Sequence, residues 1–129
     1  MLRAVALCGD AQRDVIPLNT CYVIACRAAE EAQALVAWLN STWLRAAALA
    51  VADPARGGFA RFNARTLGSL PLPRTALADR DLARLAELGA AGTAVQEELD
   101  EVSARHLGLT PADRAALTRL VAHRADARR

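Results

Sequence analysis

Lysine is absent from this chain, and its sixteen strongly basic side chains are all arginines. The missing lysine excludes a phosphate-binding P-loop, Schiff-base chemistry and a lysine-dependent nuclease centre. The formal net charge is only +2, which is too small to indicate nucleic-acid binding through bulk charge. Several enzyme classes and one simple mode of binding are therefore excluded before any motif is considered.

Metal and catalytic signatures are also missing. Cys8, Cys21 and Cys26 contain no Cys-x-x-Cys pair, so they predict no zinc site and are interpreted as buried thiols in a reducing cytosol. His106 and His123 lie far apart in sequence, without a nucleophile and an acid at a recognisable spacing. We therefore expect no metal site, no catalytic residue and no enzyme activity from this chain on its own.

The chain has no long uninterrupted apolar run. The stretch 34–52 is apolar enough to consider as a membrane span, but Asn40, Ser41 and Arg45 interrupt it near its centre. The apolar run at the start is too short for a signal peptide. With 129 residues, of which 53% are apolar, the sequence predicts one cytoplasmic domain with a real core and no membrane contact.

The first part of the chain has the pattern of a small sheet packed by a helix. Residues 2–8 and 15–26 are β-like runs around a polar turn, and the second is apolar on both faces, as a covered inner strand would be. From 28 to 50 the apolar residues follow helical spacing and predict one long helix. Asn63 is a suitable cap for a short helix over 64–69.

From Asp79 onward the pattern is helical. Gly89 and Gly92 predict a bend between two helices, Gly108 a helix end, and Thr110-Pro111 the start of the last helix. We therefore expect an α+β fold: a small β-sheet packed by a long helix over residues 1–78, followed by a C-terminal helical segment over 79–129.

Two other groups of residues are given structural interpretations. Trp38 and Trp43 could stack on bases, but both lie in the apolar helical stripe, which favours core packing. The acids at 97, 98, 100 and 101 are interpreted as a solvated helix face, with Glu101 spaced for an ion pair with Arg105.

The strongest local signal for binding is a basic segment around a glycine pair. Gly57-Gly58-Phe59-Ala60-Arg61-Phe62-Asn63 precedes the expected short helix, and Asp53 is the sole acid between residues 53 and 78. Main-chain amides and guanidinium groups there could hold DNA phosphates, and arginine can pair with guanine. An ordinary turn with Phe59 and Phe62 in the core is the alternative. The candidate DNA-binding residues are Arg56, Gly57, Gly58, Arg61, Asn63, Arg65 and Arg74.

Four ordered blocks carry a family resemblance: Pro17 to Ile24 (PLNTCYVI), Trp38 to Ser41 (WLNS), Gly57 to Asn63 (GGFARFN) and Leu70 to Pro73 (LPLP). In this order they resemble the TaqI-type C-terminal specificity domain of bacterial adenine-N6 DNA methyltransferases and fused restriction-modification enzymes. The resemblance runs from about residue 13 to 122. His106 departs from the family pattern, in which a tyrosine often precedes the Leu-Gly-Leu turn.

The resemblance implies recognition of duplex DNA in partnership with a methyltransferase catalytic domain or subunit. In the family, that domain binds S-adenosylmethionine and holds the flipped adenine with an Asn/Asp-Pro-Pro-Tyr/Phe motif. This chain contains no adjacent pair of prolines and no glycine-rich cofactor loop. We therefore expect it to bind no cofactor and to act as a recognition fragment that lacks the catalytic domain.

Two other functions stay open on the sequence alone. The segments on either side of Leu107-Gly108-Leu109 could form a helix-turn-helix regulator with Arg114 and Arg119 directed outward. A structural module that docks a partner through 79–122, without binding DNA, is the second alternative.

Overall fold

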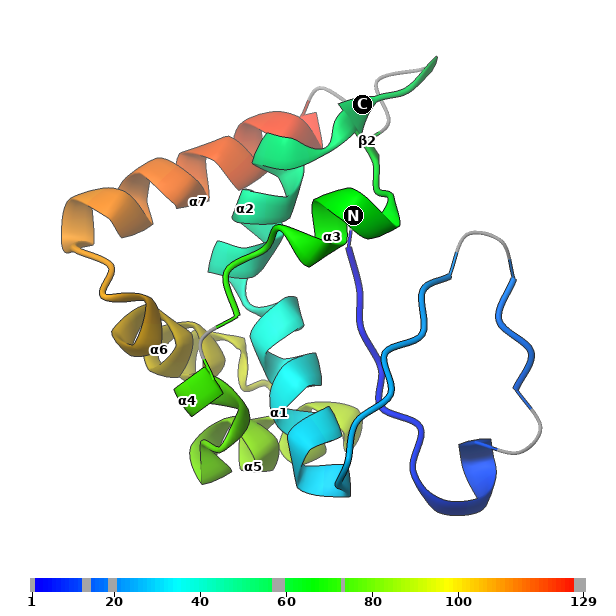
Figure 1. Cartoon of the computed structure of the whole chain (residues 1–129). Helices are drawn as coiled ribbons and strands as arrows, with labels where there is room; N and C mark the ends of the chain where they lie inside the picture. The colour runs from blue at the N-terminus through cyan, green and yellow to red at the C-terminus, as the bar shows by residue number, and fades with distance from the viewer. Residues whose placement is uncertain (1, 13–14, 19–20, 57–59, 73, 127–129) are drawn as a thin grey trace.

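The computed structural model describes residues 2–12, 15–18, 21–56, 60–72 and 74–126, and this part of the chain is mostly helical (Figure 1). A short 3-10 helix, η1, spans Gly9–Gln12. The α-helices and strands that follow are, in chain order, α1 (Ala29–Asn40), α2 (Thr42–Val51), β1 (Asp53–Pro54), β2 (Ala60–Arg61), α3 (Ala64–Gly68), α4 (Arg74–Leu77), α5 (Arg80–Ala90), α6 (Gln96–Leu107) and α7 (Pro111–Asp126).

The expected α+β fold, with a small sheet packed by a long helix, is wrong. Within the described residues the single sheet is the two-stranded antiparallel pair of β1 and β2. The runs at 2–8 and 15–26 are extended where described, but they form no strand ladder. β-Branched and apolar residues favour an extended backbone, whereas a sheet also needs a neighbour that supplies main-chain hydrogen bonds.

The predicted long helix is broken in two at Ser41. Helices α1 and α2 meet there at an angle of 67°. Ser41 has an extended backbone, and its Oγ accepts a hydrogen bond from the Leu44 amide at 3.3 Å while donating to the Trp38 carbonyl at 2.8 Å. A serine that caps a new helix start ends the preceding one, although the apolar spacing continues across the break.

The helix boundaries predicted in the second half of the chain are confirmed. Helix α5 ends at Ala90 and α6 begins at Gln96, as the glycines at 89 and 92 indicate. Helix α6 ends where Gly108 adopts the left-handed backbone with φ of 65°, a conformation that favours glycine. Helix α7 starts at Pro111, where Thr110 and Asp113 exchange hydrogen bonds.

The core lies between α1, α5 and α6, with α2 packed against α7 on the other side of the bend. Both tryptophans belong to this core, as predicted: Trp38 is 0% and Trp43 7% exposed. Buried alanines on α1 and α2 leave room for neighbouring helices to approach closely: Ala34, Ala37, Ala46 and Ala48.

The prediction that the three cysteines are buried is wrong. Cys21 is exposed, and Cys8 and Cys26 are half-buried, all three as free thiols. Burial raises the pKa of the Cys26 thiol, and the nearby Glu31 carboxylate and Cys8 raise it further. They are accessible because they lie on a largely extended segment that no sheet of described residues covers.

Candidate nucleic-acid interface

The predicted basic segment folds into the β1–β2 pair followed by α3. Asp53 lies opposite Arg61, and Pro54 opposite Ala60, in the antiparallel register. Helix α3 packs against α2, so the pair projects from one end of α2 (Figure 1). Gly57, Gly58 and Phe59 lie outside the described residues, so the role of the two glycines in binding stays a prediction.

Asn63 positions this segment through both ends of its amide. Its Oδ1 accepts from the Thr66 amide at 2.9 Å, and the Thr66 hydroxyl accepts from the Asn63 amide at 2.9 Å, which completes a capping box. Its Nδ2 donates to the Asp53 carboxylate at 2.9 Å. The predicted cap is thus confirmed, and these contacts make Asn63 a positioning residue that joins α3 to β1.

The β1–β2 pair and α3 together form a small platform, and three of the four candidate arginines lie on it. Arg56 follows β1, Arg61 lies on β2 and Arg65 lies in the first turn of α3, and all three side chains are exposed. None of them forms an ion pair with another described residue. The nearest acid in sequence, Asp53, accepts instead from Asn63. Three guanidinium groups therefore remain available to an external anion.

Arg74 is placed elsewhere. It begins α4, which packs against α1 and α6 and lies apart from α3 (Figure 1). The Leu70 to Pro73 segment separates the two short helices in sequence. Tertiary packing thus divides a group of arginines that looked continuous in the sequence, and the candidate interface is reduced to Arg56, Arg61 and Arg65.

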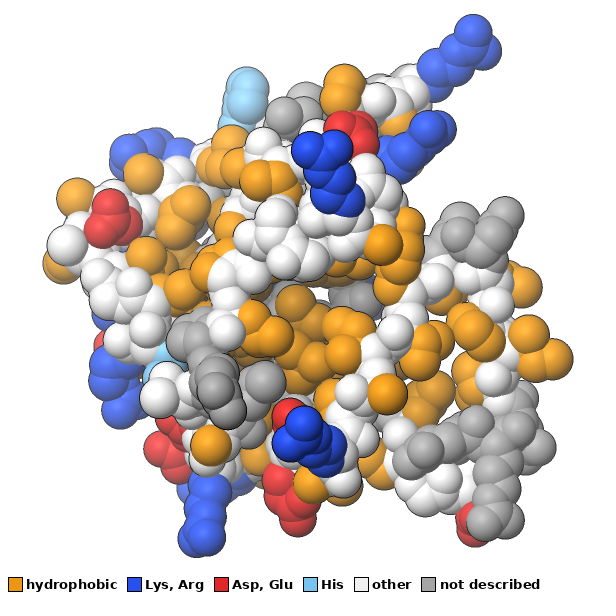
Figure 2. All heavy atoms as spheres, viewed as in Figure 1, with side chains coloured by type: hydrophobic (Ala, Val, Ile, Leu, Met, Phe, Trp, Pro, Cys, Tyr) orange, Lys and Arg blue, Asp and Glu red, His pale blue; other side chains and the backbone are white. Residues whose placement is uncertain are grey.

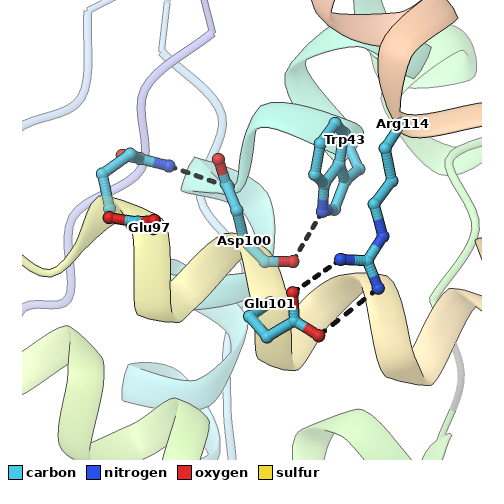
Figure 3. Close-up of a pocket in the computed structure, with 6 residues that line it drawn as sticks. Trp43, Glu97, Asp100, Glu101 and Arg114 are labelled. Carbon is cyan, nitrogen blue, oxygen red and sulfur yellow. Dashed lines mark hydrogen bonds and ion pairs between the residues drawn. The ribbon is translucent and has the colours of Figure 1, made fainter. Parts of the chain in front are cut away.

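The surface between α6 and α7 has the opposite character. An open pocket of about 500 Å³ is lined by the indole of Trp43 and by Gln96, Glu97, Asp100, Glu101 and Arg114 (Figure 3). Arg114 Nη1 donates to Glu101 Oε2 at 2.5 Å, and this guanidinium holds the pKa of the Glu101 carboxyl below its usual range. The sequence spacing predicted an ion pair between Glu101 and Arg105, whereas in the structure Glu101 forms its ion pair with Arg114.

This acidic surface disfavours a DNA-reading helix-turn-helix at α6 and α7. Arg114 is engaged by Glu101, and three carboxylates line the pocket beside it, where they would repel phosphate. Helix α7 packs against α2 rather than forming its main contact with α6. Of the two arginines that the motif would direct outward, Arg114 is therefore engaged in an ion pair.

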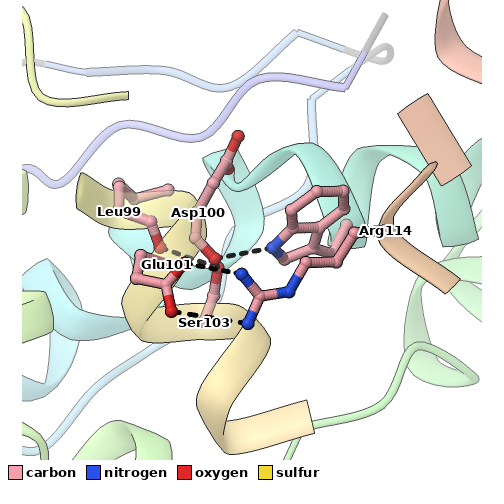
Figure 4. A network of polar contacts seen from close by, with 6 residues as sticks. Leu99, Asp100, Glu101, Ser103 and Arg114 are labelled. Carbon is pink, nitrogen blue, oxygen red and sulfur yellow. Dashed lines mark hydrogen bonds and ion pairs between the residues drawn. The ribbon is translucent and has the colours of Figure 1, made fainter. Parts of the chain in front are cut away.

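Asp100 has a structural role that the sequence pattern did not indicate. Its carboxylate accepts from the Thr42 amide at 2.7 Å and from Gln96 Nε2 at 2.9 Å, while its carbonyl accepts from Trp43 Nε1 at 2.6 Å. Figure 3 shows the contact between Trp43 and Asp100, and Figure 4 shows Asp100 beside the Glu101–Arg114 pair. The carboxylate thus caps the first turn of α2 from 58 positions away, a distance that no local sequence signal spans.

An Asp–His pair joins α5 to α6. Asp79 caps α5 and hydrogen-bonds to His106 Nε2, and the imidazole lies edge-on to Trp38 with ring centroids 6.1 Å apart. Burial alone would raise the pKa of Asp79, but hydrogen bonds from His106 and from two main-chain amides lower it overall. A catalytic triad would also need a serine hydroxyl bonded to the histidine. The hydroxyls of Ser41, Ser69 and Ser103 donate instead to main-chain carbonyls three or four residues earlier in the chain.

The Asp79–His106 pair should make the free energy of unfolding depend on pH in the acid range. Replacing Asp79 by Asn keeps a helix cap but removes the charge, so we expect lower stability toward urea at neutral pH. Because the folded pKa of Asp79 is depressed, its contribution is present above the unfolded pKa and is lost as the pH falls through the folded pKa. Urea unfolding should therefore show the variant and the wild type converging at acid pH. Glu87→Gln, an exposed change on the same helix, serves as the control; a constant gap for Asp79→Asn would contradict the prediction.

No helix in the described residues is both long and apolar enough to cross a membrane; α1 and α2 reach that length and composition only as a bent pair. The described residues contain no group of three or more potential metal-binding side chains.

Comparisons of the chain with protein-family models, with curated proteins and with solved structures find no match.

Proposed function

We propose that this chain is a DNA sequence-recognition module that works with a bacterial adenine-N6 DNA methyltransferase or restriction-modification enzyme. The observation that carries the proposal is the group of exposed arginines Arg56, Arg61 and Arg65 on one small platform, none paired with a described acid. The resemblance of the GGFARFN segment and its neighbouring blocks to the TaqI-type specificity domain supports the same function.

The platform suits contact with duplex DNA for a physical reason. Asn63 ties α3 to β1, and Tyr22 Oη donates to the Phe62 carbonyl at 3.1 Å, so the arginines project from a segment held at several points. Preorganised guanidinium groups can bind phosphates, which sets the position on DNA, and can pair with guanine in the major groove, which reads sequence. In this proposal the arginines contact DNA and Asn63 orients them.

The chemistry of methylation belongs, in this proposal, to a partner. That partner binds S-adenosylmethionine and takes the target adenine out of the stack, while this chain binds neither cofactor nor metal and is no enzyme on its own. The proposed site of action is the cytoplasm, on DNA and away from membranes.

Replacing Arg61 and Arg65 together by Ala should weaken DNA binding and reduce its salt dependence. If each guanidinium neutralises one phosphate, the slope of log binding constant against log salt should fall by up to about two units. Fluorescence anisotropy with duplexes of varied sequence, across a salt series, measures both quantities. Adding Arg56→Ala to this double variant should weaken DNA binding further and lower the salt slope further.

The double variant Arg114→Ala with Arg119→Ala removes the same number of charges from α7 and is the matched control. It should bind DNA nearly as well as wild type, with circular dichroism confirming that each variant is folded. A larger loss from the α7 pair would support the helix-turn-helix alternative instead. If the wild type binds no duplex, even together with its methyltransferase partner, the proposed function is wrong.

A further inference from the structure

The N-terminal arm, defined as the described residues 2–12, 15–18 and 21–27, exposes most of the large apolar side chains on the described surface. Apart from η1, these described parts of the arm are extended, and Figure 2 shows apolar side chains of the arm standing away from the helical body. Ile16 is 86%, Val5 79% and Val23 74% exposed. The other exposed large apolar residues of the arm are Leu7, Val15, Leu18, Tyr22 and Ile24.

Such a surface is unusual for a chain that stays alone in water. Moving valine, leucine or isoleucine side chains out of water is favourable, and contiguous apolar patches of several hundred square ångströms mark sites of association. Residues 15–26 also carry no charged side chain. The main chain there makes one hydrogen bond within the described residues, from the Cys21 amide to the Leu18 carbonyl at 2.9 Å.

The arm is nevertheless attached to the helical body at separate points. Asn40 exchanges two hydrogen bonds with the main chain of Ala4, at 2.8 and 3.0 Å. Tyr22 Oη reaches the Phe62 carbonyl, and the Arg27 amide donates to Glu31 at 2.7 Å. These contacts present the arm to a partner in a defined place, which reduces the ordering that binding would require.

The area and the charge of the arm fit a second copy of this chain. Eight exposed apolar side chains of on the order of 100 Å² each supply up to roughly 800 Å² of apolar surface, as much as each partner buries in a stable interface of standard size. Residues 15–26 of two copies, which carry no charged side chain, can meet without repulsion between like charges. Each also carries free main-chain donors and acceptors, so two copies related by a twofold axis can satisfy one another.

We propose that the N-terminal arm is the interface through which two copies of this chain form a dimer. The residues that carry the contact are Val5, Ile16, Leu18, Val23 and Ile24. The proposal does not rest on DNA binding, because the arginines of the β1–β2 and α3 platform are not part of the contact.

Sedimentation velocity of the purified full chain over a wide concentration range, under reducing conditions, tests the proposal. The reductant excludes a dimer that is merely linked through the exposed Cys21. We expect a reversible monomer–dimer equilibrium in the wild type. Replacing Ile16 and Val23 together by Glu should raise the dimer dissociation constant at least about tenfold, because each carboxylate would be buried against apolar side chains.

Leu72→Glu is the matched control, since Leu72 is also an exposed large apolar residue but lies outside the arm. It should leave the dissociation constant unchanged. Hydrogen exchange at the amides of 21–26 gives a second measure and should slow as the wild type associates. A wild type that remains monomeric at high concentration, including one whose arm is instead covered by another protein, overturns the proposal. So does an association that Ile16→Glu with Val23→Glu leaves intact.

Discussion

Replacing Trp38 by Ala should lower the free energy of unfolding by about 3–5 kcal/mol. The indole is fully buried in the core cluster and lies edge-on to His106. Its removal would leave a cavity that the surrounding helices can only partly fill. Urea unfolding followed by circular dichroism measures the effect.

Trp38→Phe separates the two contributions of this side chain. The indole Nε1 donates to the Pro71 carbonyl at 2.9 Å and so ties α1 to the segment before α4. Phenylalanine keeps much of the apolar volume but removes that donor, so we expect a smaller loss of about 1–3 kcal/mol.

DNA binding distinguishes this interpretation from the alternative that Trp38 stacks on bases. A folded Trp38→Phe variant should bind duplex DNA as the wild type does. If Trp38→Ala unfolds at the same urea concentration as wild type and loses DNA affinity, the indole acts at an exposed binding surface and its assignment to the core is wrong.

Replacing Asp100 by Ala should lower the free energy of unfolding by about 1–3 kcal/mol, because the partly buried main-chain amide of Thr42 would lose its acceptor. The carboxylate of Asp100 accepts from the Thr42 amide at 2.7 Å and lies at the start of α2, where the helix dipole favours a negative charge. Urea unfolding checks the prediction, and Asp100→Asn, which keeps an acceptor without the charge, should lose less.

Glu97→Ala is the control for Asp100, since it removes a carboxylate from an exposed position on the same helix. It should change the unfolding free energy little. Equal effects of the two substitutions would mean that Asp100 belongs to a solvated face after all.

Local sequence signals determined the helix boundaries in the second half of the chain. Gly108 ends α6 and Thr110-Pro111 starts α7 because the conformations they favour depend on a few adjacent residues. Asn63 caps α3 for the same reason, since its main partner, Thr66, is three positions away. The tryptophans could be assigned to the core because helical spacing alone places them on an apolar face.

The candidate binding site could be predicted only in part. Its residue types and the Asn63 cap follow from the sequence, but Arg74 joins α4 while the other candidate arginines surround the β1–β2 pair and α3. The distance in space between residues of one short segment depends on which helices each part packs against. The second role of Asn63, its hydrogen bond to Asp53, likewise depends on the pairing of β1 with β2.

The ends of most helices in the second half of the chain and the burial of both tryptophans could thus be predicted from the amino-acid sequence, because capping and helical periodicity are local. The bend at Ser41 also has a local cause, the cap by Ser41, but the apolar spacing that continues across it predicts one helix. Two further features depend on tertiary structure: the cap that Asp100 supplies to α2, and the extended, mostly exposed state of the described parts of 15–26. Asp100 is distant in sequence from the amide it accepts from, and a strand-forming run becomes a strand only where another chain segment pairs with it.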